Sequence, residues 1–340
     1  MIETDKIKTI SANGILLSFL TVFLILIAGL SLLGKSADYD NYMTMVVDKT
    51  EMVGGANEVA FKCIVKINDI FFNSNFQTFL VIFAIIGVSL KIYALFRFSK
   101  IPLLSYFLYV FSYFILHEYV QIRAGVATGI FLLAIIDLAN GDLKKYFIKS
   151  FIAIMFHWSS VILVPLYFVV RHLKVQIFYF LPFIGVIFYF NGLNLHAFLG
   201  DLLGPVEILF NYYQTHAGHV EEVNAFNFIT ISQVGIFLVC AILLSRKKEV
   251  DAFDFTMFKI FSISLFLFFM LSSFGLPVIA FRVSEYLNVV LLLLIPAVVS
   301  FFREKFFLSM LLVFYYFLYL FHLIVNTQVI PAVLIFFRSL

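Results

Sequence analysis

Long apolar runs dominate the chain and leave only short polar segments between them. The runs lie near residues 13–33, 75–96, 101–118, 121–139, 147–170, 175–191, 225–245, 255–273, 283–301 and 306–324. A helix of roughly 20 apolar residues crosses the hydrocarbon core of a bilayer, where backbone polar groups must find partners within the protein. Only 13% of the 340 residues are charged, against about 25% in soluble domains. The sequence therefore predicts an all-α polytopic membrane protein with a single integral membrane domain over residues 1–340.

Short clusters of Lys and Arg separate many of these runs, and such clusters mark cytoplasmic loops. They are Lys6 with Lys8, Arg97 with Lys100, Lys144 with Lys145 and Lys149, Arg171 with Lys174, Arg246 with Lys247 and Lys248, and Arg303 with Lys305. Because the positive charge is spread over these loops, the net charge of +3 does not indicate a nucleic-acid partner.

If every apolar run crosses the membrane in turn, the cluster at residues 171–174 lies outside, and the basic clusters after it also fall on the wrong side. A re-entrant pair of half-helices over 149–170, broken at 156-FHWSS-160, returns every cluster to the cytoplasm. This topology has about nine transmembrane helices, with the amino end inside and the loops 34–74 and 192–224 outside. The alternative is a complete span at 147–170 with a local exception to the charge rule.

The outer loop 34–74 contains a segment with helical periodicity at residues 58–72. Its apolar positions are Val59, Cys63, Ile67 and Ile70, with Lys62 and Lys66 beside them. This pattern predicts an amphipathic helix on the membrane surface.

Evidence for a metal or cofactor is weak. The two cysteines, Cys63 and Cys240, form no CxxC or Cys/His motif. His216, His219 and Glu221 lie close together in the second outer loop, but they lack the helical H-E-x-x-H spacing of a zinc site. We therefore expect no metal and no cofactor.

Glu118 and Arg123 are opposite charges between two long apolar runs. Charged side chains at membrane depth are costly, so they indicate a functional site. Arg123 opens a helix rich in small residues, and Arg282 lies at another outer helix start. Two arginines on one face are suited to a pyrophosphate group. The alternative is structural: Arg123 pairs with Glu118, Arg282 pairs with Glu285, and both arginines reach to the interface.

His157 lies at the expected helix break. Its imidazole can accept a proton near neutral pH and is therefore a candidate general base. Glu118, Asp38 and Glu58 are alternatives for the same role. The structural explanation for His157 is a neutral imidazole that hydrogen-bonds the broken backbone.

Several short motifs, in this order along the chain, resemble those of the EpsG-like family of bacterial polysaccharide polymerases, which is related to Wzy-type O-antigen polymerases. They are 38-DYDNY-42, Glu58, Tyr119-x-x-x-Arg123-x-Gly125-x-Ala127, Ala153-x-x-Phe156-His157-x-Ser159 and 282-RVSEY-286. Two positions depart from the family pattern, with Ala124 where a Gln is common and a reduced closing motif at 326-NTQVIP-331.

The resemblance implies a glycosyltransferase of the bacterial inner membrane whose active site faces outward, with a glycosyltransferase-C-like fold. Such an enzyme transfers a growing glycan from undecaprenyl diphosphate onto a lipid-linked repeat unit, in O-antigen, capsule or exopolysaccharide biosynthesis. Its partners would be undecaprenyl-diphosphate-linked glycans, membrane lipids, and possible chain-length regulator and flippase proteins. A flippase or transporter of these units and an O-antigen ligase are the alternatives.

The resemblance also suggests roles for individual residues. Arg123 and Arg282 would bind the diphosphate, and His157 or Glu118 would accept the proton. Asp38 would be a further catalytic candidate. Sugar-binding or supporting roles would fall to Glu58, Tyr119, Tyr213, Glu285 and Tyr286.

Overall fold

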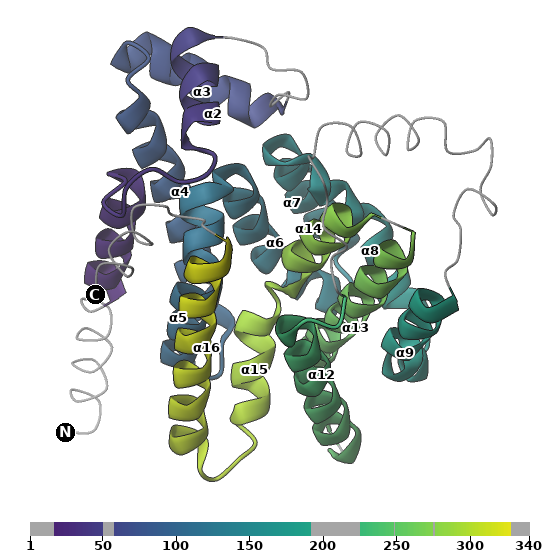
Figure 1. The fold of residues 1–340 in the computed structure, drawn as a ribbon. Helices are drawn as coiled ribbons and strands as arrows, with labels where there is room; N and C mark the ends of the chain where they lie inside the picture. Colours follow the sequence, from purple (N-terminus) through teal and green to yellow (C-terminus); the bar gives the residue numbers. More distant parts are fainter. Residues whose placement is uncertain (1–16, 50–57, 192–224, 248, 275, 328–340) are drawn as a thin grey trace, which may run out of the picture. The chain divides into compact units, whose positions relative to one another are not determined.

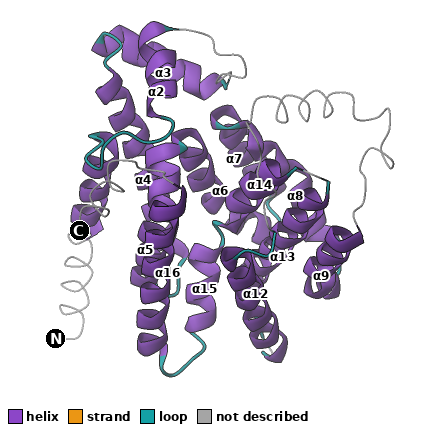
Figure 2. Ribbon diagram, viewed as in Figure 1, coloured by secondary structure: helices purple, strands orange, loops and turns teal. Residues whose placement is uncertain are grey.

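The computed structural model describes residues 17–49, 58–191, 225–247, 249–274 and 276–327 (Figure 1). Every regular element in these ranges is a helix, which confirms the all-α class (Figure 2). The chain divides into two compact units, Met1–Val164 with Ile295–Leu340, and Pro165–Leu294. Tyr213 and the metal candidates in loop 192–224 lie outside the described residues.

The first unit begins with an apolar helix at Leu17–Gly29 and holds most of the elements discussed below. These are α2 Tyr39–Met43, the π-helix η1 Thr44–Asp48, α3 Val59–Phe72, α4 Phe76–Phe98, α5 Pro102–Tyr109, the π-helix η2 Val110–Val120, α6 Ile122–Asn140, α7 Leu143–Phe156, the 3₁₀-helix η3 Trp158–Ile162 and α16 Lys305–Thr327. Helix α6 packs against α4, α7 and η2, whereas α3 packs against α4 and α7.

In the second unit, α13 packs against its neighbours α9, α12 and α14. The bounds are α9 Val175–Asn191, α12 Phe228–Arg246, α13 Ala252–Ser273 and α14 Pro277–Asn288. Two further helices, α8 Leu163–His172 and α15 Leu291–Val299, begin in one unit and end in the other.

Six described helices are long and apolar enough to cross a membrane, and a bent pair brings the number to seven. The six are Phe76–Phe98, Pro102–Val120, Ile122–Asn140, Phe228–Arg246, Ala252–Ser273 and Lys305–His322. They confirm six of the expected spans. The bent pair is Val278–Asn288 with Leu291–Val299, at 49°, where a single run at 283–301 was expected.

The two remaining expected spans, at 13–33 and 175–191, are shorter apolar helices among the described residues, at Leu17–Gly29 and Val175–Asn191, and a third short apolar helix, Trp158–His172, lies in the expected re-entrant pair. The first of them ends before two positive-φ residues, Ser31 (φ 50°) and Gly34 (φ 96°), which stop a right-handed helix. Apolar composition alone therefore placed the end of the first helix too late, at residue 33, whereas the bounds 175–191 agree with Val175–Asn191.

The helix break at His157 is confirmed. Helix α7 ends at Phe156, His157 is extended (φ −155°, ψ 123°), and a 3₁₀ turn follows before α8. The Tyr146 hydroxyl donates a hydrogen bond of 2.8 Å to the Leu163 carbonyl, so a side chain serves the backbone just beyond the break. Such a partner is required where a helix is interrupted away from water.

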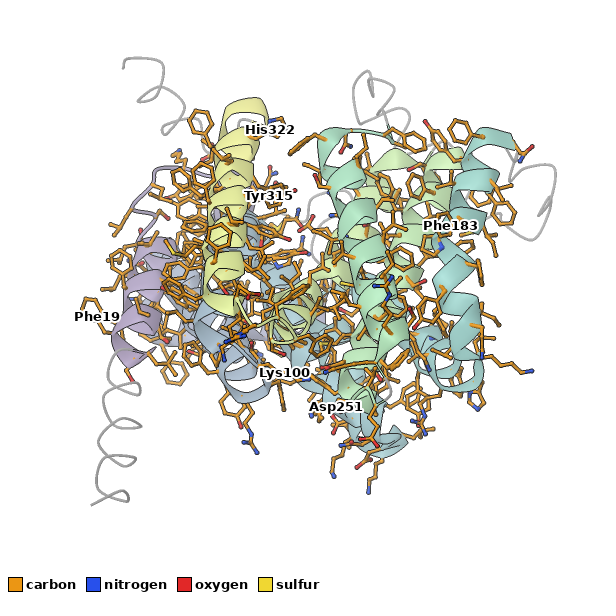
Figure 3. All side chains as sticks on the ribbon, turned by 90° about the horizontal axis from the view of Figure 1, so that it is seen from below. Phe19, Lys100, Phe183, Asp251, Tyr315 and His322 are labelled. Atoms are coloured by element: carbon orange, nitrogen blue, oxygen red, sulfur yellow. The ribbon has the colours of Figure 1, made fainter. Side chains whose placement is uncertain are left out.

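The two spans α6 and α16 differ sharply in their surroundings. Within its most apolar window, 83% of Ile122–Asn140 is buried inside the protein, against 6% of Lys305–His322. Tyr315 and His322 mark α16 in Figure 3, and Phe19 marks the first described helix. Helix α6 is thus an interior element of the first unit, whereas α16 exposes most of its apolar surface among the described residues.

Candidate functional site

Three ionisable side chains from distant parts of the sequence meet in the first unit. Arg123 Nη1 lies 2.7 Å from Glu58 Oε2, and His157 Nδ1 lies 3.6 Å from Glu58 Oε1. The two oxygens of one carboxylate therefore face a guanidinium and an imidazole. We refer to Glu58, Arg123 and His157 as the carboxylate-bridged cluster.

Each member of the cluster lies at a helix end. Glu58 is the extended residue that precedes α3 (φ −65°, ψ 134°), and Arg123 is the second residue of α6. Helix α6 starts afresh after Gln121 (φ −96°, ψ 57°), which terminates the π-helix η2. His157 is the extended residue between α7 and η3. Backbone groups at helix ends lack partners within the helix, which suits a ligand site.

Two aromatic rings flank the Arg123 guanidinium. Its Cζ atom lies 5.7 Å from the centre of the Tyr42 ring and 5.4 Å from that of the Phe61 ring, both cation–π distances. Tyr42 and Phe61 are buried, whereas the Arg123 side chain keeps 21% exposure. A guanidinium has five N–H donors, so these contacts leave Arg123 able to bind an anion while its plane stays oriented.

The Glu58 carboxylate is held ionised by its neighbours. Burial raises its pKa, but the His157 imidazole and the positive charge of Arg123 lower it, and the net pKa lies below the usual value. The His157 Nδ1 atom is buried and has no hydrogen-bond partner among the described residues, because 3.6 Å to Glu58 exceeds hydrogen-bond range. A protonated His157 would find a carboxylate already beside it.

Glu118 has a different partner from the one expected. Its carboxylate lies 2.5 Å from Lys91 Nζ, and both side chains are buried. The interpretation that Arg123 pairs with Glu118 is therefore wrong, since Arg123 pairs with Glu58. The sequence analysis did not identify Lys91. A lysine within the apolar run 75–96 is an intramembrane charge, and such charges are usually paired.

Tyr119 serves the backbone of the segment that precedes α2. Its hydroxyl donates to the Gly34 carbonyl (2.6 Å) and accepts from the Leu33 amide (2.9 Å). These bonds fasten the chain ahead of α2 to the end of η2, and α2 carries Tyr42. Tyr119 thereby supports the aromatic wall beside Arg123 from a distance.

The other predicted site residues lie apart from the cluster in sequence. Asp38 is the residue before α2, and its charge acts on Tyr42. Arg282, Glu285 and Tyr286 belong to α14 of the second unit, where Arg282 is exposed, Glu285 is partly exposed and Tyr286 is buried. The expectation that Arg282 lies at a helix start is wrong, because α14 already begins at Pro277.

The comparison with family models concerns almost the entire chain. The EpsG family model matches residues 14–333, a range that contains all members of the carboxylate-bridged cluster. No curated protein and no solved structure matches the chain. Extended similarity over both compact units confirms the resemblance that the short motifs indicated. The chain thus belongs to the EpsG family of multi-pass membrane proteins, which is linked to exopolysaccharide biosynthesis.

Proposed function

We propose that this protein is a polysaccharide polymerase, a membrane glycosyltransferase that transfers a growing glycan from undecaprenyl diphosphate onto a lipid-linked repeat unit. The observation that carries the proposal is the shared carboxylate of Glu58, which contacts Arg123 through one oxygen and faces His157 with the other. Anion binding and proton transfer are the two tasks that a reaction with a diphosphate leaving group requires.

In the proposed reaction, His157 is the general base. The acceptor hydroxyl attacks the anomeric carbon of the donor sugar, and its proton passes to the imidazole. The bond between the anomeric carbon and the diphosphate oxygen breaks, and the electron pair leaves with undecaprenyl diphosphate. Arg123 stabilises the negative charge that develops on this leaving group. Glu58 stabilises the imidazolium through Nδ1, so that Nε2 is the nitrogen that faces the acceptor.

The finer topology is also a proposal. We place the segments 34–74 and 192–224 on the outer face, with nine spans and a re-entrant hairpin over 149–170 whose tip is His157. The extended backbone at His157 supports a tip at this residue. In the first unit, Asp38 would contact sugar or serve as an alternative base. The roles that the resemblance suggests for Arg282, Glu285 and Tyr286 of the second unit stay predictions.

The phenotype of a strain without the protein tests the proposed activity. We expect surface glycans that carry one repeat unit and no longer chains, with restoration of the chain-length ladder by the wild-type gene. Complete loss of surface units would favour a ligase. Accumulation of lipid-linked units on the cytoplasmic side would favour a flippase. Either of these two results would overturn the polymerase assignment.

Cysteine labelling in intact cells tests the orientation of the site. In a Cys63→Ser/Cys240→Ser background, Lys62→Cys lies on the exposed side of α3 and Arg97→Cys lies in the last turn of α4. We expect a membrane-impermeant maleimide to label Lys62→Cys from outside, and Arg97→Cys only after permeabilisation. The reverse pattern would place Glu58 on the cytoplasmic face and contradict the proposed topology.

A further inference from the structure

A fully buried ion pair joins two membrane-spanning helices of the first unit. Lys91 of α4 and Glu118 of η2 lie 2.5 Å apart, with 0% and 1% of their side chains exposed. Buried pairs contribute little net stability, because desolvation of both charges offsets their attraction, and apolar residues often replace them without loss. Two charges in the interior of a membrane protein therefore require an explanation other than stability.

The Lys91 ammonium contacts the chain on both sides of the break that precedes α6. It binds the Glu118 carboxylate three residues before Gln121, and it donates to the Gly125 carbonyl four residues after it. Arg123 lies between these two contacts. The Lys91 ammonium thus joins α4 to the end of η2 and to the first turn of α6. These two contacts lie on either side of Arg123 in the sequence.

Two glycines make room for the pair. A Cβ atom on Gly87 would overlap the Glu118 carboxylate, and a Cβ atom on Gly125 would overlap the His117 carbonyl and lie 3.2 Å from Glu118 Oε2. The helices α4, η2 and α6 therefore approach one another closely around the Glu118 carboxylate. A side chain larger than glycine at position 87 or 125 would require neighbouring atoms to move. Within α6, the Thr128 hydroxyl lies within hydrogen-bond distance of the Ala124 (2.9 Å) and Gly125 (3.0 Å) carbonyls, so the first turn also has a side-chain donor from its own helix.

We propose that Lys91 and Glu118 are a positioning pair that sets the direction of Arg123 toward the diphosphate. The inference rests on the proposed function, because it assigns Arg123 the diphosphate. Neither member of the pair forms an ion pair with Arg123, whose carboxylate partner is Glu58. The pair acts through the backbone of residues 121–125, whereas Glu58 contacts the Arg123 guanidinium directly.

The test measures the affinity of the full-length protein in nanodiscs for undecaprenyl diphosphate. Trp158, the single tryptophan of the chain, follows His157 directly and is exposed, so its fluorescence reports occupancy beside the cluster. The variant Lys91→Met/Glu118→Gln removes both charges together and leaves no unpaired one. We expect it to bind about tenfold more weakly, the effect of one lost charge-assisted hydrogen bond, with a melting temperature within about 4 °C of wild type.

A double-mutant cycle with Arg123→Ala distinguishes positioning from a general structural effect. If the pair acts through Arg123, adding Lys91→Met/Glu118→Gln to Arg123→Ala should weaken binding no further. Wild-type affinity in the Lys91→Met/Glu118→Gln variant, or full additivity in the cycle, would overturn the inference. Wild-type affinity in Arg123→Ala alone would instead overturn the proposed function.

A second variant covers the case in which removal of both charges prevents folding. Glu118→Asp keeps the ion pair but shortens one arm by a methylene group. We expect weaker binding that is again not additive with Arg123→Ala. Normal binding in Glu118→Asp, together with an unfolded Lys91→Met/Glu118→Gln protein, would mean that the pair serves stability alone and would refute the positioning role.

Discussion

Arg123→Lys should reduce polymerisation by roughly 100-fold or more while the protein remains folded in the membrane. The expected size is that of one lost donor to a developing negative charge. Lysine keeps a positive charge beside Glu58, so no buried carboxylate is left unpaired. It lacks the planar fork of arginine, and it loses the orientation that the Tyr42 and Phe61 rings give to the guanidinium.

The measurement is the rate of chain extension with purified protein and a lipid-diphosphate-linked repeat unit, accompanied by the chain-length ladder in cells. Arg97→Lys is the matched control, because Arg97 is an exposed residue at the end of α4. We expect this control to behave as wild type. Full-length ladders in Arg123→Lys and Arg123→Ala strains at normal protein level would remove Arg123 from the proposed site.

The second large effect is expected from His157→Gln and Glu58→Gln, which should both lower the rate of chain extension. Loss of the general base should lower the rate by about 10²–10⁴-fold. Glu58→Gln should lower it as well, because this change removes the counter-charge of His157 and the partner of Arg123 at once. The rate of chain extension is compared with two controls, His172→Gln and Glu304→Gln, at exposed positions. A Glu58→Gln protein with wild-type rate would contradict the bridging role of its carboxylate.

Glu58→Gln should also change how the stability of the protein depends on pH. The folded protein lowers the pKa of Glu58, so the ionised carboxylate stabilises the fold at neutral pH, and this contribution is lost as the pH falls through the lowered pKa. At neutral pH, Glu58→Gln should therefore reduce the free energy of unfolding by about 1–3 kcal/mol. The difference from wild type should shrink toward acid pH in thermal unfolding experiments. A difference that grows toward acid pH would contradict the sign of this shift.

Local sequence patterns predicted the elements that frame the cluster. Helical periodicity located α3, and the polar residues at 156–160 located the break at His157. These features depend on neighbours within a few residues, where spacing and side-chain chemistry decide the outcome. The three residues were identified separately: Arg123 as a charge between apolar runs, His157 as the imidazole at the helix break, and Glu58 as an alternative base.

Which of these residues pair with one another depends on packing between distant segments. This packing cannot be predicted from local sequence patterns. Glu118 and Arg123 are five residues apart, but the break at Gln121 separates their helices and directs them to different partners. Glu58 is 65 residues from Arg123, and Lys91 is 27 residues from Glu118. Without the contacts of α3 and α4 with their neighbours, no spacing rule connects these pairs. The bend after Asn288 was likewise missed, because no proline or glycine lies between α14 and α15.

Helix α3 has consequences for the depth at which the proposed enzyme works. Phe61 and Ile64 point into the protein, whereas Val59, Ile67, Ile70 and Phe71 remain exposed. An apolar side of this kind settles at the boundary between headgroups and acyl chains. In the proposed polymerase, Glu58, which precedes the same helix, would lie at the level at which a polyprenyl carrier holds its phosphates. In the proposed polymerase the carrier therefore keeps its isoprenoid tail in the bilayer throughout the reaction, and successive carriers exchange by lateral diffusion without any step that lifts a lipid into water.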